Sequence, residues 1–567
     1  MMAKEEATVE ELVNSIKQGK IRLPEMQRGY VWPATRVRDL LDSLYRDYPS
    51  GTILLWETDS DVPQQEFAIK QQDSSSLNHR LLLDGQQRLT SLSAVIRGEP
   101  VYVRGRKRPI EILFNLNHPD DLSVVTEVDE NNREVDGLIE DETDSNTDEL
   151  QARIEKMAFV ISTKQLANLP HWVKVSDVFK TDSNLGFLKK AGSSNLDDPQ
   201  AEKFFKRLDK LRSIKKYFYR LDVLEKSLSY DEVTEIFVRV NSLGVKLRGS
   251  DLAMAQISSK WHGSLETFQG FQKECEQDGF KLDLGIFLRN LVAFATGYSR
   301  FETVGRLSQP QLEEAWKQSV KGMQYALNFL KNKNNVGIES PALLSSPYLI
   351  IALAYFGYKC DYMPGSEDEG LARWALLTNA KGRYSRGSSV TILDQDLAIL
   401  RDGGGVGKLL DQLRQQVGRL AIEPGELEGR NQNSALFKTM FLAFRDGGAK
   451  DWDSKIGIAL DNSGKQHRLE IHHLFPKGVL KDGTYTTREV NDIANLAFIG
   501  GRTNRKIGST PPEDYFPDFI TKLGEEPFEV QCIPIDRYLL ELDNYREFLA
   551  RRRELISERL NSFLGNT

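Results

Sequence analysis

The sequence predicts an α+β protein built from three domains. Strand and helix patterns alternate through the first 260 residues, and helical periodicity dominates the stretch that follows. Short strands, glycine turns and a charged final helix fill the last part of the chain. At 567 residues the chain is also too long for one ordinary domain. We therefore expect a mixed domain at 1–260, a helical linking domain at 261–426 and a third domain at 427–567.

Caps and apolar spacing predict the N-terminal elements. Thr8 and Glu11 are spaced as a capping box, and the apolar positions after Thr8 predict a helix that ends at Gly19. The following patterns predict an extended segment at 23–32, a helix near 37–44, strands at 52–56 and 80–83, and a hairpin at 101–116.

The middle of the chain is helical by the spacing of its apolar residues. One run repeats at intervals of four and three, which is typical of a helix with one buried face: Leu312, Trp316, Val320, Met323, Leu327 and Leu330. We assign these residues a packing role alone. Three glycines at 403–405 predict a turn or a boundary.

The composition is that of a soluble globular protein, with 40% hydrophobic and 28% charged residues. The longest apolar stretch, from Tyr348 to Phe356, is far shorter than the roughly 20 residues of a spanning helix. The charged N-terminus lacks the apolar core of a signal peptide. Three scattered cysteines predict neither a disulfide framework nor a cysteine zinc site. These features predict a cytoplasmic protein without a membrane partner.

The negative charge is concentrated in one segment. Residues 127–149 hold eleven acidic residues and one arginine, a local net charge of −10. Since the whole chain has a net charge of −7, the remainder has a net charge of +3. The acidic run lacks apolar periodicity and predicts a disordered loop or insertion. Basic clusters at 104–108 and 551–553 suit phosphate contacts. Solvated surface charge explains either cluster alone equally well.

The pentapeptide Asp84-Gly85-Gln86-Gln87-Arg88 lies between a buried-strand pattern and a helix that ends at Gly98. It therefore occupies a strand-to-helix turn, where free backbone N–H groups and the helix dipole favour a phosphate. Arg88 adds a forked donor for the same anion, and Asp84 suits a metal or a ribose hydroxyl. The alternative is a structural turn with Arg88 on the surface, because the pentapeptide has no generic chemistry.

Further segments accompany this turn. They are LPEMQRGYVW at 23–32, YPSGTILLW at 48–56, and EIFVRVNSLG at 235–244 followed by SDLAMAQI at 250–257. With LLLDGQQRLT at 81–90, they resemble the N-terminal domain of the GmrSD-type (DGQQR plus HNH) type IV restriction and phage-defence family, whose relatives include BrxU and SspE. The fold of that domain is similar to the ParB/sulfiredoxin-like nucleotide-binding domains. The resemblance covers roughly residues 8–260.

The resemblance implies binding, and with it hydrolysis, of a nucleoside triphosphate, either GTP or ATP. By position, the implied nucleotide or metal contacts come from Gln27, Arg28, Asp84, Gly85, Gln86, Gln87 and Arg88, with Arg239 and Asn241 closing the pocket. No P-loop sequence is present. Tyr30 and Trp32 form either a stacking surface for DNA beside this pocket or a part of the core.

Histidine is concentrated near the C-terminus: three of the seven lie between residues 467 and 473. His472 and His473 end an apolar strand, residues 491–499 predict a second strand, and residues 503–506 open a short helix. A neutral imidazole can take a proton from water near pH 7, and one divalent ion can stabilise phosphate charge. We therefore assign His473 as a general base and His472 with Asn504 as metal ligands in a ββα-metal unit.

Other residues complete this expected site. Asn495 would hold the histidine loop in register through backbone hydrogen bonds, and Arg505 or Lys506 would contact a neighbouring phosphate. The alternatives are a structural zinc site, for which no cysteine lies nearby, and an ordinary strand end.

The strings EIHHLFPK, IANLAFI and TNRKIG resemble the HNH nuclease domain of GmrSD proteins. His472 stands where many relatives carry Asp or Glu, and Asn504 is compatible with Mg²⁺ or Mn²⁺.

The two resemblances together imply a nucleotide-regulated, modification-dependent DNA endonuclease that nicks or cleaves phage DNA. The expected partners are double-stranded DNA, which is modified or phage-derived, and nucleotide; a homodimer is left open. The alternative from another class is a nucleotide-gated DNA-binding sensor or regulator without significant nuclease activity. A general DNA-repair nuclease, indifferent to modification, is the third hypothesis.

Overall fold

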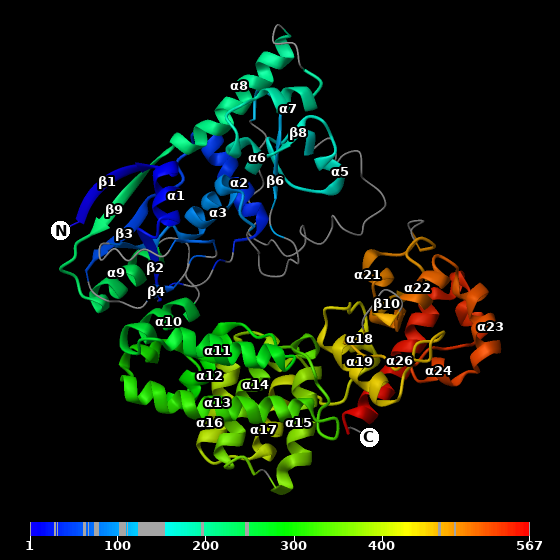
Figure 1. Cartoon of the computed structure of the whole chain (residues 1–567). Coiled ribbons are helices and arrows are strands. Elements are labelled where there is room, and N and C mark those ends of the chain that lie inside the picture. The colour runs from blue at the N-terminus through cyan, green and yellow to red at the C-terminus, as the bar shows by residue number, and fades with distance from the viewer. Residues whose placement is uncertain are drawn as a thin grey trace. The chain divides into compact units, whose positions relative to one another are not determined.

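The computed structural model describes residues 2–565 except 26, 28–29, 31, 60–63, 66, 68, 73–78, 101–108, 110, 123–153, 194–197, 244–248, 364, 463–466 and 481–483, and except the side chains of residues 79, 231, 238, 241–243 and 366. It comprises two compact units, Met1–Leu265 and Glu266–Thr567, each described by itself (Figure 1). A mixed sheet organises the first unit and the second is largely helical, so the predicted α+β class is confirmed at this level. The predicted acidic loop and the basic cluster at 104–108 lie outside the described residues.

A six-stranded mixed sheet forms the centre of the first unit. Its strands lie in the order β1 (Met2–Thr8), β9 (Phe218–Leu224), β3 (Ile53–Thr58), β5 (His79–Asp84), β2 (Ile21–Pro24) and β4 (Gln64–Gln65). β9 runs parallel to β3 and β2 runs parallel to β5, whereas the other neighbours are antiparallel. The carboxyl ends of β2 and β5 therefore meet at one edge of the sheet.

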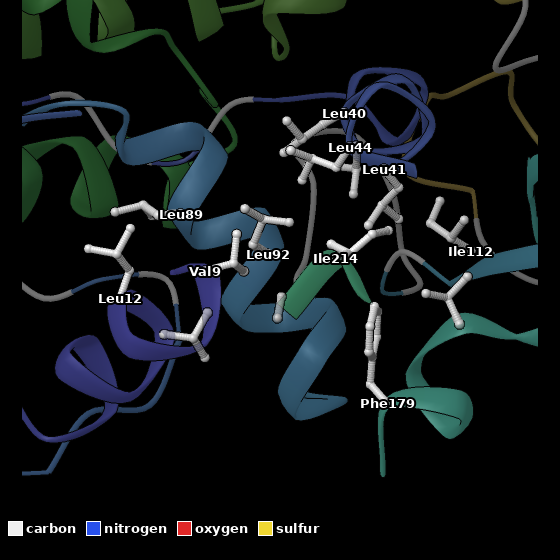
Figure 2. Packing of buried hydrophobic residues seen from close by; sticks show 14 of the residues in the cluster. Val9, Leu12, Leu40, Leu41, Leu44, Leu89, Leu92, Ile112, Phe179 and Ile214 are labelled. Atoms are coloured by element: carbon white, nitrogen blue, oxygen red, sulfur yellow. The ribbon is translucent and has the colours of Figure 1, made fainter. Parts of the chain in front are cut away.

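Helices cover both faces of this sheet. One face packs against α1 (Val9–Lys17), α2 (Ala34–Tyr45), α3 (Gln86–Arg97), α6 (Val175–Lys180) and α8 (Pro199–Ser213). Figure 2 shows buried side chains from α1, α2, α3 and α6 in this cluster. The other face contributes Leu54, Trp56, Leu81 and Leu83 to a second cluster with α9 (Tyr230–Leu243) and α10 (Gly249–Lys260). Because both faces are buried, β5 contains three consecutive leucines instead of an apolar–polar alternation.

A small antiparallel sheet joins this unit. β6 (Ile112–Asn115) pairs with β7 (Phe159–Ile161) and β8 (Trp172–Lys174) on either side. The hairpin predicted at 101–116 falls mostly outside the described residues; its described part, β6, has these two later strands as partners. The remaining elements are α5 (Lys164–Ala167), α7 (Leu185–Lys190) and the 3-10 turn η1 (Ile214–Lys216).

The predicted capping box of α1 is confirmed. The Glu11 backbone N–H donates to Thr8 Oγ1 at 3.2 Å, and the Thr8 backbone N–H donates to the Glu11 carboxylate at 2.7 Å. The strand β1 before it has no apolar alternation, because most of its side chains are exposed. It forms through backbone pairing with β9, which local sequence patterns do not reveal.

The second unit begins as a helical assembly. Its helices are α11 (Ser264–Gln277), whose first residues close the first unit, α12 (Leu284–Thr296), α13 (Gln309–Lys331), α14 (Tyr348–Lys359), α15 (Asp368–Ala380), α16 (Ser389–Arg401), α17 (Val406–Val417), α18 (Pro424–Leu427) and α19 (Ala435–Asp446). Short 3-10 turns are η2 (Phe301–Arg306), η3 (Pro341–Leu343), η4 (Gly365–Glu367) and η5 (Arg383–Ser385). The apolar stripe predicted for α13 is confirmed: all of its residues are buried except Val320, which is partly buried.

The end of the chain adds a two-stranded sheet to these helices. β10 (Leu469–His473) pairs antiparallel with β11 (Leu496–Gly500). The helical elements around this pair are α21 (Thr487–Val490), η6 (Ile493–Asn495), α22 (Gly501–Ile507), α23 (Pro512–Leu523), α24 (Glu526–Glu529), α25 (Arg537–Leu540), η7 (Leu542–Asn544) and α26 (Tyr545–Phe563). The strand predicted at 491–499 is wrong in its first half, because residues 491–495 form a helix end and a 3-10 turn. Within the described ranges, no helix combines the length and the apolar content that crossing a membrane requires.

A buried ion pair lies inside the helical assembly. Arg383 donates two hydrogen bonds to the Asp396 carboxylate, of 2.9 and 2.7 Å, and the Tyr384 hydroxyl donates a third at 2.7 Å. Both charged side chains are 0% exposed. Removing one partner of such a pair leaves an uncompensated buried charge.

We expect Asp396→Asn to lower the free energy of unfolding by about 3–5 kcal/mol, because Arg383 loses its counter-charge. Asp411→Asn is the matched control: its pair with Arg414 is largely exposed and contributes under about 1 kcal/mol. Urea denaturation followed by circular dichroism measures both. Equal effects of the two substitutions would contradict this account of the buried pair.

Candidate functional site

Two sequence segments meet at the edge of the large sheet where β2 and β5 end. Since these strands are parallel, Glu25 and Gln27 follow β2 at the edge where β5 ends at Asp84 and Gly85 follows. This edge of a sheet with parallel strands is a common place for ligands. The topology thus brings together two motifs that are about 55 residues apart in the sequence.

The turn after β5 requires its glycine. Gly85 has a φ of 99°, which L side chains rarely adopt, and a Cβ there would lie 2.4 Å from Ile53 Cδ1. The backbone can therefore enter α3 directly from the strand, as the sequence predicted. The first turn of α3 contains Gln86, which is buried, and Gln87 and Arg88, which are partly buried.

Side chains tie the 23–32 segment to this turn. Gln27 Nε2 donates to the Leu82 carbonyl, and the backbone N–H of Trp32 donates to Gln87 Oε1 at 3.2 Å. The Tyr30 and Ser91 hydroxyls are 2.9 Å apart. Tyr30 and Trp32 are partly buried against the main core, which favours the packing interpretation over a stacking surface.

Arg88 is bound within the protein. Its guanidinium donates to the carbonyls of Ser50 and Thr52, the latter at 2.7 Å, and to Asp84 Oδ2 at 3.0 Å. The interpretation of Arg88 as a surface residue is therefore wrong. The guanidinium holds the loop before β3 against the Asp84 turn, while the Asp84 side chain remains 40% exposed.

The EIFVRVNSLG segment at 235–244 contributes less than expected to this edge among its described residues. Arg239 is exposed on α9 and forms an ion pair with Glu235, four residues earlier on the same helix. No described contact joins Arg239 to Asp84 or Arg88. Arg28 and the side chain of Asn241 lie outside the description.

Glu25 is a buried residue that the sequence did not single out. Its carboxylate accepts from the backbone N–H of Gly263 at 3.1 Å and of Leu265 at 2.7 Å. These N–H groups lie at the start of α11, where free donors and the helix dipole attract a negative charge. The only sequence signal was an acidic residue inside the polar 23–32 segment.

A second cluster lies where β10 meets α22. His472 is 2% exposed, and its Nδ1 lies 2.8 Å from Oδ1 of Asn504. Its Nε2 lies 3.3 Å from the Tyr515 hydroxyl, which also donates to the Leu474 carbonyl at 3.0 Å. Burial lowers the pKa of His472 to about 4, so the ring is neutral at pH 7.

Carboxylates surround the other polar residues of α22. Asn504 Nδ2 donates to Glu470 Oε2 at 2.8 Å, and Arg505 lies 3.7 Å from the same carboxylate. Lys506 Nζ pairs with Asp453 at 3.2 Å. The Arg505 and Lys506 side chains stay about half exposed, at 55% and 54%, which leaves them accessible to a phosphate.

His473 is partly buried at the end of β10. Its Nε2 lies 3.3 Å from Oδ1 of Asn491, a residue that sequence reasoning had placed in a strand without a role. Burial, with a smaller contribution from Lys477, lowers the pKa of His473 to about 4. This ring is therefore also neutral at pH 7 and has a lone pair for a proton.

Asn495 makes the backbone hydrogen bonds expected of it. Its Oδ1 accepts from the Phe475 N–H at 2.9 Å, and its Nδ2 donates to the carbonyls of Phe475 and Val490 at 3.1 and 3.0 Å. The side chain is fully buried. These bonds fix the chain just after His473 to the turn before β11.

The basic cluster at 551–553 is not a phosphate-binding surface, and that interpretation is corrected. Arg552 is 0% exposed and donates to the backbone carbonyls of Ala494, Gln531 and Cys532. Arg553 pairs with the buried Asp492 at 2.6 Å. These arginines lie on the inner face of α26, which the helical spacing alone did not reveal.

The metal hypothesis rests on His472 and Asn504. Among the described residues, no group of three or more His, Cys, Asp and Glu side chains is arranged to hold an ion. Any ion at this site would therefore use the Asn504 amide oxygen beside an imidazole nitrogen.

A family model matches the N-terminal part of the chain, and one relative aligns with most of its length. Residues 9–258 match the family described as the GmrSD restriction endonuclease, N-terminal domain, which confirms the resemblance for this part. An uncharacterized protein of Methanocaldococcus jannaschii, MJ0686, is 21% identical over 552 residues, covering 90% of this chain and 86% of the relative. The resemblance of the histidine region to HNH nucleases remains a prediction.

We expect Arg552→Ala to destabilise the second unit by several kcal/mol, because three buried carbonyls lose a charged donor at about 1.5–3 kcal/mol each. Arg551→Ala is the matched neighbour: its side chain is 51% exposed and pairs with Glu554. Thermal unfolding of both variants measures the difference. A stable Arg552→Ala protein with weakened DNA binding would restore the phosphate-binding interpretation.

Proposed function

We propose that this chain is a restriction-type DNA endonuclease that cuts at the β10–β11–α22 unit. One observation carries the proposal: at the end of an antiparallel strand pair, His472 meets Asn504 of the following helix, and His473, next in the strand, lies beside Asn491, with Asn495 bracing the loop. The family matched by residues 9–258 is described as a restriction endonuclease, which supports DNA as the substrate.

The residues fit a divalent cation such as Mg²⁺ or Mn²⁺. His472 Nδ1 and Asn504 Oδ1, which are 2.8 Å apart, would hold it, and both nitrogen and oxygen donors suit such an ion. If Tyr515 donates its proton to Leu474, His472 Nε2–H can donate to the Tyr515 oxygen. With its proton on Nε2, His472 would offer the Nδ1 lone pair to a cation held together with Asn504 Oδ1; without a cation that lone pair would face an acceptor, and the ring would carry its proton on Nδ1.

The reaction would be hydrolysis of a phosphodiester. A bound cation would stabilise the phosphate charge and the leaving oxygen. His473, neutral at pH 7, accepts a proton from the attacking water. Asn495 holds the loop after His473, so that the ring keeps its position during the step. Arg505 and Lys506 lie on the same helix as Asn504 and would contact the next phosphates along the strand.

The N-terminal unit would supply nucleotide-dependent control. The sheet edge formed by Gln27, Asp84 and the start of α3 offers an exposed carboxylate next to helix N–H groups, a setting suited to a nucleotide with its cation. Because Gln27 and Arg88 bond to carbonyls of the protein, we assign them to shaping this edge. Recognition of a DNA modification is part of the proposal through the family resemblance alone.

The cutting site predicts that supercoiled plasmid incubated with Mg²⁺ or Mn²⁺ is nicked or linearised. We expect His473→Ala to slow this reaction by about 10²–10⁴-fold, the usual contribution of a general base. His467→Ala, an exposed histidine of the same region, should keep wild-type activity. Gel electrophoresis of the plasmid forms is the measurement, and chelation by EDTA should stop the reaction.

Nicking that survives His473→Ala would remove this assignment. A protein that binds DNA without cutting any substrate would favour the sensor or regulator hypothesis.

A nucleotide site at the sheet edge beside Asp84 leads to a second prediction. It is measured on a panel of unmodified, cytosine-modified and phosphorothioate DNA with and without GTP or ATP. We expect nucleotide to change the cleavage rate of the wild type and Asp84→Asn to lose this response, since the exposed carboxylate is removed. Asp59→Asn is the control, because Asp59 follows β3 at the opposite edge of the sheet and pairs with Lys226.

Rates that respond to nucleotide equally in both variants would argue against a nucleotide site at this edge. Equal rates on every DNA of the panel would instead indicate a general nuclease.

A further inference from the structure

A general base in this site needs one particular form of the His473 ring. A neutral imidazole carries its proton on either Nδ1 or Nε2, and only the bare nitrogen can accept a proton from water. The neighbouring groups decide which form is present. This inference rests on the proposed nuclease function and concerns the residue that makes the choice.

The amide of Asn491 has a defined orientation. Its Nδ2 donates to the backbone carbonyl of Thr487 at 3.0 Å, and a carbonyl oxygen can only accept. The amide nitrogen must therefore face Thr487, which turns Oδ1 toward the ring of His473. Oδ1 lies 3.3 Å from Nε2, within hydrogen-bonding distance.

An amide oxygen can only accept as well, so the ring nitrogen facing it carries the hydrogen. His473 is thereby held with its proton on Nε2 and its lone pair on Nδ1. In the described part of the chain, no residue makes a hydrogen bond to Nδ1. If the Asn491 amide were flipped, its Oδ1 would face the Thr487 carbonyl oxygen, and two acceptors repel each other. This disfavours the form of His473 that carries its proton on Nδ1.

The support behind Asn491 is itself firmly held. Asn491 follows α21, whose Thr486 and Glu489 form a capping box. The Glu489 carboxylate accepts from Arg546 at 2.7 Å, and the Tyr545 hydroxyl donates to the Glu489 carbonyl at 2.8 Å. The helix α26 thus anchors the segment that carries Asn491.

We propose that Asn491 is a positioning residue that selects the Nε2–H form of His473 and so leaves Nδ1 as the proton acceptor. In the step, a water oxygen forms a bond to phosphorus while Nδ1 takes one proton from that water. The bond from phosphorus to the leaving ester oxygen breaks, and this oxygen takes a proton from solvent. The imidazolium then returns its extra proton to solvent, which balances the step.

Two readouts on the full chain test the inference. In ¹⁵N-histidine-labelled protein at pH 7.5, long-range ¹H–¹⁵N spectra identify the His473 form, and the signal is assigned by its loss in His473→Gln. We expect Nε2–H in the wild type and a mixture of forms in Asn491→Ala. Plasmid cleavage by Asn491→Ala should show kcat lowered by about 10- to 100-fold with KM unchanged, part of the contribution of a general base.

Matched variants separate positioning from folding. Asn544→Ala removes a similar partly buried amide, whose Nδ2 donates to the Tyr538 carbonyl at 2.8 Å, and should keep the wild-type form and kcat. Asn491→Asp keeps an acceptor for the same N–H but sets a carboxylate oxygen against the Thr487 carbonyl, so it should recover only part of the lost kcat.

Nδ1–H in the wild type, or an unchanged form and kcat in Asn491→Ala, would overturn the inference. If the wild type cleaves no DNA, the proposed function falls, and the spectra alone decide the role of Asn491.

Discussion

The C-terminal site depends on one buried amide. Asn495 bonds to both the N–H and the carbonyl of Phe475 and to the carbonyl of Val490, so it joins the loop after the histidines to the turn before β11. A buried amide that loses such partners is costly, which makes this junction rigid. Arg552 donates to the carbonyl of Ala494, the residue before Asn495. His473 and Asn491 extend from the two segments that Asn495 joins.

A different constraint shapes the N-terminal unit: the parallel pairing of β2 with β5. It places the 23–32 segment beside the Asp84 turn, and the antiparallel β3 brings the loop at Ser50 to the same edge. Arg88 then donates to backbone carbonyls of the loop before β3, and Gln27 donates to the Leu82 carbonyl of β5. Residues expected to contact a nucleotide thus also build the edge that would hold it.

Two buried carboxylates near the candidate sites also hold the protein together. Glu25 caps α11 next to the candidate nucleotide edge, and Asp492 accepts from Arg553 and from the Gly429 N–H close to Asn491. Each such group needs its partners, because an unpaired buried charge is strongly destabilising. Polar residues near both candidate sites therefore contribute to stability as well as to any chemistry.

Local chemistry in the sequence determined the capping box of α1, the turn at Gly85, the buried face of α13 and the strand ending at His473. Each depends on residues within a few positions of one another, so spacing reveals it. The tertiary structure alone decided that β1 pairs with β9, that Arg552 is buried, that Arg88 faces carbonyls and that Asn491 meets His473. Most of these contacts join residues that are distant in the chain, and the burial of Arg552 depends on which side of its helix faces the core. Burial and hydrogen-bond geometry arise only when the elements pack together.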